Sequence, residues 1–576
     1  MVTIFKNMIP YRRMIAGILI CLIAQAFCDL TLPQYMADII DVGILGGDTS
    51  VIYSFGGRML FVAVFMLAAS VASGYLSAKV GAGIGRDLRS SVFEKVVGFS
   101  NEQMDRFLTA SLITRSTNDI QQIQMVSVIL LRMVAYAPII GIGGIVKVVQ
   151  TKSGMEWIIA LSVLILLGFV LLLVAVAMPK FKEIQKLIDA LNLVSREILT
   201  GLSVIRAFGR EKWEEKRFDQ ANQSLKRTQL FAGRIMNLMM PGMMLVMYGT
   251  TLLIVWVSAR RIDAGTLQVG EMTAFITYSM QIVMAFLMLT AMSIMLPRAG
   301  VSAERIDEVR KAKATVMEPE HPVTDTAEKG AVTFSHVRFR YPDAKEDALY
   351  DIDFTAEPGK VTALIGGTGC GKSTLVQLIP RFYDVTEGSI SIDGTDVREL
   401  SLKTLREEIG FVPQKSVLFS GTIESNLRFG NPFADEDVIL EAAEIAQAAE
   451  FIKEREDGLS SPISQGGSNV SGGQKQRLAI ARAIAKQPKI YIFDDSFSAL
   501  DMKTDAALRK ALKERVKDAT VIIVAQRIST IRHADQILVL EEGKIAGKGT
   551  HEDLLADCDV YRQIAKSQIS MQELGI

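Results

Sequence analysis

Residues 366–374 have the composition and spacing of a loop that binds nucleotide phosphates. The segment matches the pattern G-x-x-x-x-G-K-S through Gly366, Gly371, Lys372 and Ser373. Glycines let backbone N–H groups close around phosphate oxygens, the lysine neutralises β- and γ-phosphate charge, and the serine hydroxyl ligates Mg²⁺. The pattern predicts binding of ATP with Mg²⁺. The predicted contacts are Gly366, Gly367, Thr368, Gly369, Cys370, Gly371, Lys372, Ser373 and Thr374.

A second segment, YIFDDSFSALD at Tyr491–Asp501, supplies carboxylates. Its apolar run ends at Asp494, and a strand that ends in aspartate is where many ATPases hold Mg²⁺. Asp495 follows, in the position from which a carboxylate acts on the attacking water. Because aspartate is the shorter carboxylate, the segment leaves open whether the chain hydrolyses ATP or only binds it.

A third segment, NVSGGQKQR, places Ser471, Gly472 and Gly473 directly before a basic, helix-forming run. The N–H groups at the start of a helix form a favourable site for phosphate. The chain already has a phosphate loop for its own nucleotide. A second phosphate site therefore predicts that two such domains enclose nucleotide between them.

The elements around these segments are those of an α/β domain. AVTFSHVRFRY alternates apolar and polar residues as a strand does, and KVTALIG is a strand that leads into the phosphate loop and a helix. The segment before them is polar, contains two prolines and lacks periodicity, which indicates a linker. We therefore predict a nucleotide-binding domain at 331–576, preceded by a linker at 311–330.

The first half of the chain has the composition of a membrane domain. A membrane-spanning helix needs about 20 mostly apolar residues. We predict an all-α transmembrane domain at 1–310, with an uncleaved first helix because Asp29 follows its apolar run without a clear cleavage site. Six stretches meet the length requirement, approximately 14–34, 52–78, 126–149, 156–178, 235–259 and 271–296.

The charge of the loops predicts the orientation. Segments 79–125 and 179–234 are rich in Lys and Arg, whereas the loop after the first span has three aspartates and no basic residue. The positive-inside rule places both long segments, the N-terminus and the second domain in the cytosol, with Arg260 and Arg261 as exceptions. Helical spacing predicts long helix extensions that end in tips near 100–107 and 209–216. Such tips either pass motion to the membrane or are simple solvated hairpins.

Composition excludes several classes. Acidic and basic residues balance at 63 each, so net charge indicates no partner, and six spans disfavour an ATPase that acts on nucleic acid. The four cysteines lack the spacing of metal ligands and are expected to be free thiols. They are Cys21, Cys28, Cys370 and Cys558.

Methionines and a few polar residues distinguish the spans. Methionines concentrate in the fifth and sixth, which suits either a cavity that accepts many shapes or ordinary helix packing. Asp29, Arg132 and Gln281 are polar groups within spans, where charge is costly and usually functional. Asp29 either attracts a cationic substrate or is exposed near the outer end of its helix.

Together, the phosphate loop and the Ser-Gly-Gly-Gln motif resemble the nucleotide-binding domain of ATP-binding cassette (ABC) transporters. The whole chain, essentially all 576 residues, resembles a half-transporter of the exporter type. The resemblance implies that Tyr341 stacks on adenine and that Ser373, Gln414 and Asp494 contact Mg²⁺. It also implies that a signature motif completes the partner's site and that Ser498–Asp501 crosses the dimer. The signature consists of Val470, Ser471, Gly472, Gly473 and Gln474.

Two positions depart from the family pattern in a way that affects catalysis. Asp495 stands where glutamate is usual and Gln526 where the switch histidine is usual; SPISQGG also lacks an acidic residue often found there. Aspartate withdraws the carboxylate by roughly 1–1.5 Å, and about 1 Å of misplacement can cost on the order of 10²-fold in rate. Glutamine carries no titratable proton. We predict a degenerate site that binds MgATP but hydrolyses it slowly.

This interpretation makes the chain one subunit of a heterodimeric exporter whose partner carries the catalytic glutamate and histidine. The resemblance suggests drug-like or lipid-like amphipathic cargo and the cell's inner (plasma) membrane. Three alternatives stay open. They are a homodimer in which Asp495 works as the base, a nucleotide-gated subunit of a narrow-specificity peptide transporter, and an importer of the same architecture.

Overall fold

The computed structural model describes residues 6–568 except 152, 325–328, 343 and 499. The chain forms two compact units. The first comprises Met1–Lys95 and Ala110–Lys311, and the second comprises Val96–Thr109 and Ala312–Ile576.

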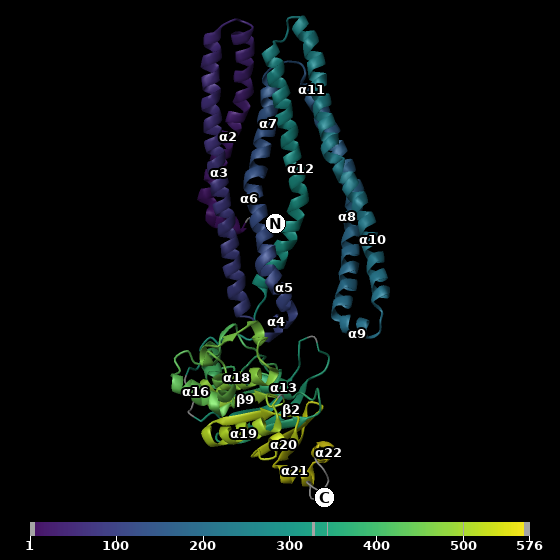
Figure 1. The fold of residues 1–576 in the computed structure, drawn as a ribbon. Coiled ribbons are helices and arrows are strands. Elements are labelled where there is room, and N and C mark those ends of the chain that lie inside the picture. Colours follow the sequence, from purple (N-terminus) through teal and green to yellow (C-terminus); the bar gives the residue numbers. More distant parts are fainter. Residues whose placement is uncertain (1–5, 152, 325–328, 343, 499, 569–576) are drawn as a thin grey trace. The chain divides into compact units, whose positions relative to one another are not determined.

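The first unit is helical (Figure 1). Its first hairpin contains α2 (Arg12–Asp38), which continues as η2 (Ile39–Ile44), and α3 (Thr49–Val97). An almost continuous helix follows, through α5 (Thr109–Thr114), η3 (Arg115–Asp119), α6 (Ile120–Ile129), η4 (Leu130–Val134) and α7 (Ala135–Gln150). The remaining helices are α8 (Glu156–Thr200), α9 (Leu202–Ala207), α10 (Glu211–Asn237), α11 (Met239–Asp263) and α12 (Val269–Lys311).

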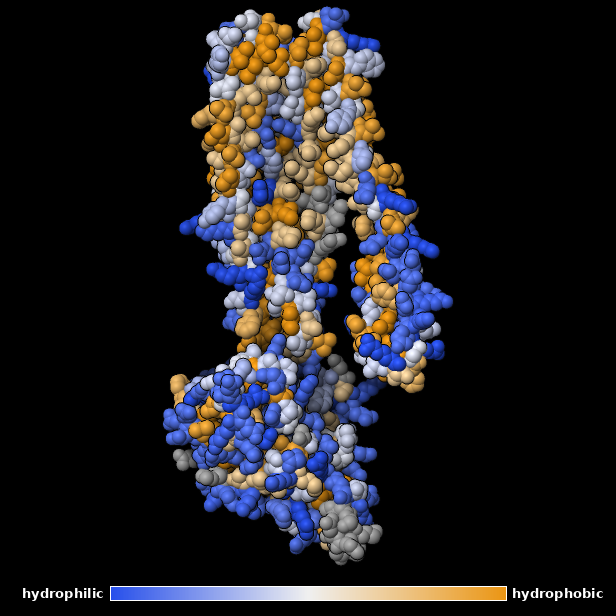
Figure 2. Space-filling view, in the orientation of Figure 1, coloured by the Kyte–Doolittle hydropathy of each residue, from blue (hydrophilic) through white to orange (hydrophobic). Residues whose placement is uncertain are grey.

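Six helical segments of the described chain are long and apolar enough to cross a membrane. They are Lys6–Ile44, Thr49–Val97, Thr109–Gln150, Glu156–Thr200, Glu211–Asp263 and Val269–Thr290. Each predicted apolar stretch lies in or overlaps one of these helices. Figure 2 shows hydrophobic side chains over the upper part of this unit and hydrophilic ones over its lower helices. On α8, Leu166 and Val170 pack against Met243, whereas Leu164 and Leu171 face outward, as lipid-exposed residues do.

The structure explains why Arg261 is an exception to the positive-inside rule. Its guanidinium donates hydrogen bonds to the carbonyl oxygens of Ser153 and Gly154, in the connection between α7 and α8. These carbonyls lie past the end of α7, where a cation is a suitable partner. The arginine therefore ties the last turn of α11 to the connection between α7 and α8.

The expectation that Asp29 lies near the outer end of its helix is wrong. The helix continues through η2 to Ile44, 15 residues further on, which is about 22 Å of helix. The Asp29 carboxylate accepts a hydrogen bond from the Tyr136 hydroxyl, and its carbonyl accepts one from the Gln281 side chain at 3.0 Å. Interactions with α7 and α12 thus satisfy a polar group inside the span.

The second unit is built on sheets. Its strands are β1 (Val332–Phe339), β2 (Leu349–Ala356), β3 (Val361–Gly366), β4 (Glu387–Ile392), β5 (Thr395–Asp396), β6 (Ile409–Val412), β7 (Gly421–Thr422), β8 (Pro462–Ile463), β9 (Ile490–Asp494), β10 (Thr520–Val524), β11 (Gln536–Glu541) and β12 (Lys544–Gly549). Its helices are α4 (Asn101–Phe107), α13 (Lys372–Leu378), α14 (Leu402–Glu407), α15 (Ile423–Leu427), α16 (Glu436–Ile445), α17 (Ala449–Lys453), α18 (Gly472–Ala485), α19 (Met502–Arg515), α20 (Ile528–Ile531), α21 (His551–Asp557) and α22 (Asp559–Gln568).

A six-stranded sheet of order β12-β11-β3-β10-β9-β6 forms the centre of this unit. Its strands pair in parallel except for β12, and an antiparallel sheet of order β2-β1-β4-β5 covers one face. Successive side chains of a strand point to opposite faces. Leu364 and Ile522 therefore pack with the antiparallel sheet, whereas Ala363 and Ile523 pack with the helical layer that contains α16 and α18.

The short helix α4 belongs to the second unit although the first surrounds it in the sequence. Ser100 and Gln103 form a capping box at its start. The Tyr383 hydroxyl donates a hydrogen bond to the Asp105 carboxylate at 3.2 Å, and the hydroxyls of Ser100 and Thr315 lie 2.9 Å apart. The predicted tip at 100–107 is thus attached to the sheet-containing unit. The other, at 209–216, is the turn before α10 and the start of that helix, in the first unit.

Phe354→Ala is expected to destabilise the second unit by about 3–5 kcal/mol. Phe354 is 1% exposed and stacks on Phe334 with ring centroids 4.7 Å apart, so truncation opens a cavity between the two sheets. Urea titration of the full chain with pulse proteolysis, scored by cleavage within 331–568, measures the change. The matched control is Phe433→Ala, at a side chain 93% exposed, with an expected change within about 0.5 kcal/mol. Equal shifts in the two variants would contradict this packing.

Candidate nucleotide site

The phosphate loop connects the end of β3 to the start of α13. Gly371 caps α13 in the left-handed region with φ of 99°, and Gly369 has φ of 84°. A Cβ atom on Gly366 would lie 2.2 Å from the carbonyl oxygen of Leu540 on the adjacent strand β11. Glycine is therefore required where the loop leaves the sheet, and left-handed backbone turns the chain into the helix.

Lys372 and Ser373 lie at the first turn of α13. The Lys372 amine donates hydrogen bonds to the carbonyl oxygens of Gly366 and Gly367 at 2.8 and 2.7 Å, so it lies across the loop. The Ser373 hydroxyl donates one to the Asp494 carboxylate at 2.8 Å. A hydroxyl and a carboxylate that meet in this way form an oxygen donor set of the kind that Mg²⁺ prefers.

Asp494 is the last residue of β9 and is 2% exposed. Burial raises the pKa of its carboxyl group, the hydrogen bond from Ser373 opposes this effect, and the neighbouring Asp495 adds to it. Two adjacent buried carboxylates without an ion pair among the described residues favour binding of a cation.

Asp495 is held by two amide side chains. The Gln414 and Gln526 Nε2 groups both donate hydrogen bonds to its Oδ2, at 3.1 and 2.7 Å. Burial raises the pKa of the Asp495 carboxyl group, and the two amide hydrogen bonds lower it. The backbone has φ of 49°, which turns the chain sharply after the strand. The two departures from the family pattern thus contact each other directly.

Tyr341 lies beside the loop. Its hydroxyl is 2.9 Å from that of Thr374, and the ring is edge-on to Tyr383 at 5.4 Å. The ring is partly exposed, so an aromatic face remains for stacking. Cys370 is buried within the loop, and a Cβ atom on Gly367 or Gly369 would meet nothing within 4 Å. Thr368, between these two glycines, is exposed.

Ser471 and Gln474 form a capping box at the start of α18. The Ser471 hydroxyl accepts a hydrogen bond from the Gln474 N–H at 3.3 Å, and the Gln474 side chain accepts one from the Ser471 N–H at 3.1 Å. Ser471 and Gly472 are exposed, whereas Gly473 is half-buried. In the described chain, no hydrogen bond joins this segment to residues 366–374. The helix start is thus available to a ligand from outside its own loop.

The loop after Asp495 leads into α19. Ser498 donates a hydrogen bond to the Asp495 carbonyl at 2.9 Å, and Asp501 caps α19 by accepting one from Thr504 N–H at 2.9 Å. Ala499, within the predicted dimer-crossing loop, lies outside the described residues.

One contact in the site was absent from the sequence-based predictions. The Gln568 side chain, at the end of α22, donates to the Gln526 carbonyl at 2.8 Å and accepts from the Ile528 N–H at 2.9 Å. It therefore holds the loop that carries Gln526. Because Gln568 lies 42 residues further along the chain in an amphipathic helix, no local pattern indicates this contact.

Comparison with known proteins agrees with this arrangement. The model of the ABC transporter transmembrane region matches residues 15–286, and that of the ABC transporter family matches 349–498. An uncharacterized ABC transporter ATP-binding protein of Mycobacterium tuberculosis H37Rv is 43% identical, covering 98% of both chains. An ATP-dependent lipid A-core flippase of Pseudomonas fluorescens is 33% identical, covering 88% of this chain and 84% of the flippase.

A solved structure has the same fold. A bacterial Atm1-family ABC exporter with ATP bound superimposes with a TM-score of 0.80 at 25% identity, covering 97% of this chain and 99% of the exporter. The membrane helices and the phosphate loop at the end of β3 therefore belong to one known architecture. The chain is a member of the ABC transporter family, a multi-pass membrane protein of the exporter type with a cytosolic nucleotide-binding domain.

Proposed function

We propose that this chain is the degenerate-site subunit of an ATP-driven exporter, which binds MgATP at its own phosphate loop and hydrolyses it slowly. The observation that carries this proposal is the pair of hydrogen bonds from Gln414 and Gln526 to a single oxygen of Asp495. A general base needs a free lone pair within reach of the water. Here two amide donors occupy the same oxygen, Oδ2, of a short carboxylate, and neither amide can accept the proton afterwards.

The intact signature supports a partner. Ser471 and Gln474 present a capped helix start and exposed backbone at 471–472. A helix start of this kind suits the terminal phosphates of a nucleotide held by another subunit. We propose that this subunit is a second half-transporter with a catalytic glutamate and a switch histidine.

Binding, in this proposal, uses the residues that the structure brings together. Tyr341 stacks on the base, Lys372 and the glycine N–H groups hold the phosphates, and Ser373 with Asp494 holds Mg²⁺. The metal would supply charge neutralisation at the β- and γ-phosphates. Gln414 lies at this edge of the sheet and also contacts Asp495. It therefore connects the bound nucleotide to the residue in the general-base position.

An amphipathic cargo is supported by the membrane unit and by one relative. Met240, Met244 and Met284 expose flexible, polarisable side chains on α11 and α12, whereas Met243 is buried between helices. The similar Pseudomonas fluorescens protein is a lipid A-core flippase. We therefore propose drug-like or lipid-like amphipathic molecules as cargo, moved out of the cytosolic leaflet.

Restoring the family residues tests the degenerate site. The double substitution Asp495→Glu with Gln526→His is expected to raise steady-state ATP turnover of the chain purified alone by tenfold or more, because about 1 Å of misplacement can cost on the order of 10²-fold. Lys372→Ala added to that variant is expected to abolish the gain. High turnover in the unmodified chain, within the ordinary range of several per second, would instead favour a homodimer in which Asp495 is a competent base.

Asp495→Asn tests the electrostatic state of the site. Because burial raises the folded-state pKa of Asp495, the folded chain binds this proton more tightly than the unfolded chain. The carboxyl group therefore contributes stability at low pH that is lost as the pH rises through the raised pKa. The neutral variant is expected to have a higher urea midpoint than the unmodified chain at pH 7, and this gain is expected to shrink as the pH falls. A gain that grows on acidification would contradict this account.

Gln568→Ala tests the tether on the Gln526 loop. Loss of two hydrogen bonds frees this loop, and each is worth about 0.5–1.5 kcal/mol. ATP turnover of the Asp495→Glu, Gln526→His chain is expected to change by roughly 2–10-fold, while its affinity for ATP stays within twofold. Gln563→Ala, at an exposed position of the same helix, is the control. Equal kinetics in the two variants would show that α22 does not position the loop.

A further inference from the structure

A groove of about 1300 Å³ runs beside α19 in the second unit. It follows β10 and β3 from Lys360 and Lys517, near the start of these strands, to Ser529 and Arg532 around α20. Its residues are distinct from those of the phosphate loop. The volume exceeds the roughly 300–1,000 Å³ of common small-molecule sites.

The floor of the groove is aliphatic. Buried side chains of Leu512, Val521, Ile523 and Ile531 line it, together with several alanines. Among the described residues that line it, none is Phe, Tyr or Trp. Nucleobases and other aromatic ligands are usually held by aromatic stacking. A flexible alkyl chain suits this floor better, because it needs only continuous apolar contact.

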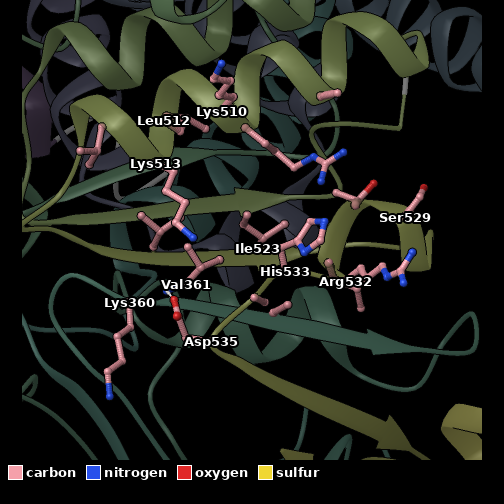
Figure 3. A pocket seen from close by; sticks show the side chains of 18 of the residues that line it. Lys360, Val361, Lys510, Leu512, Lys513, Ile523, Ser529, Arg532, His533 and Asp535 are labelled. Carbon is pink, nitrogen blue, oxygen red and sulfur yellow. Dashed lines mark hydrogen bonds between the residues drawn. The ribbon is translucent and has the colours of Figure 1, made fainter. Parts of the chain in front are cut away.

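The walls are cationic. Among the described residues that line the groove, seven are lysine or arginine and one, Asp535, carries a carboxylate. That carboxylate accepts a hydrogen bond from the Val361 N–H at 2.8 Å. Two of the seven, Lys360 and Arg509, are paired with Glu357 and Asp505. In the described chain, Lys513 and Arg532 form no ion pair. Figure 3 shows Lys513 extending from α19 toward the strands and the His533 imidazole lying beside Ile523.

We propose that this groove binds a single-chain amphipathic anion, a long-chain fatty acid, with its alkyl chain along β10 and its carboxylate at the cationic wall to which Lys513 and Arg532 belong. The aliphatic floor would remove the alkyl chain from water, and the unpaired cations Lys513 and Arg532 would attract the carboxylate. The groove shares no residue with the phosphate loop at 366–374, although Arg527 and Gln568, beside the Gln526 loop, also line it.

Photoaffinity labelling of the full chain in detergent tests the site. The probe is a palmitate that carries a diazirine on its alkyl chain, and labelled peptides are mapped by mass spectrometry. We expect labelling within residues 502–535, reduced at least tenfold in the Lys513→Glu, Arg532→Glu variant. The matched variant Lys503→Glu, Lys566→Glu makes the same change of charge on α19 and α22 outside the groove, and is expected to label like the unmodified chain. Lys372→Ala, in the phosphate loop, is also expected to leave labelling unchanged.

The neutral fatty alcohol with the same diazirine separates the two halves of the proposal. It is expected to label residues 502–535 at least tenfold less than the acid. Equal labelling by acid and alcohol would reduce the groove to a nonspecific apolar surface and overturn the proposal. Labelling that persists in the Lys513→Glu, Arg532→Glu variant, or that falls outside residues 502–535 altogether, would also overturn it. Unchanged urea midpoints show that the variants remain folded.

Discussion

The parallel pairing of β3, β10 and β9 is the constraint on which the nucleotide site depends. Val524 pairs with Leu364 on one side and with Asp494 on the other. This register brings the carboxyl ends of three strands to one edge of the sheet, where ligands of open α/β sheets bind. Residues as distant in the sequence as Ser373, Asp495 and Gln526 meet there because each follows the carboxyl end of one of these three strands.

The same edge of the sheet explains why the two unusual residues, Asp495 and Gln526, contact each other. Gln526 follows β10 and Asp495 follows β9, and their side chains are joined at 2.7 Å. Histidine at 526 would bring a titratable, chargeable donor, and glutamate at 495 would reach further. Here the uncharged Gln526 side chain instead donates a hydrogen bond to the shorter carboxylate of Asp495. We propose that a site of this kind retains the groups that bind phosphate and metal while it weakens the one that activates water.

Buried polar groups find partners in different ways in the membrane unit and in the sheet-containing unit. In the membrane unit, Asp29, Arg261 and Gln281 each reach a hydrogen-bond partner on a neighbouring helix or loop, since unpaired polar groups are costly in lipid. Among the described residues of the sheet-containing unit, the buried carboxylates Asp494 and Asp495 lie at the nucleotide edge without an ion pair. Burial is the first cause of the raised pKa values of Asp494 and Asp495, and carboxyl groups with perturbed pKa values cluster at functional sites.

The sequence by itself determined the six spans, the phosphate loop and the identity of the two unusual residues. The spans depend on long apolar runs and the phosphate loop on glycines and a lysine at fixed spacing, whereas the two unusual residues stand out through the resemblance of their motifs to the family. Only the tertiary structure decided the hydrogen-bond partners of Asp29, the attachment of α4 to the sheet-containing unit, the tether from Gln568 and the groove beside α19. These features depend on which distant segments pack together, and hydrophobic periodicity specifies which face of an element is buried but not what it is buried against.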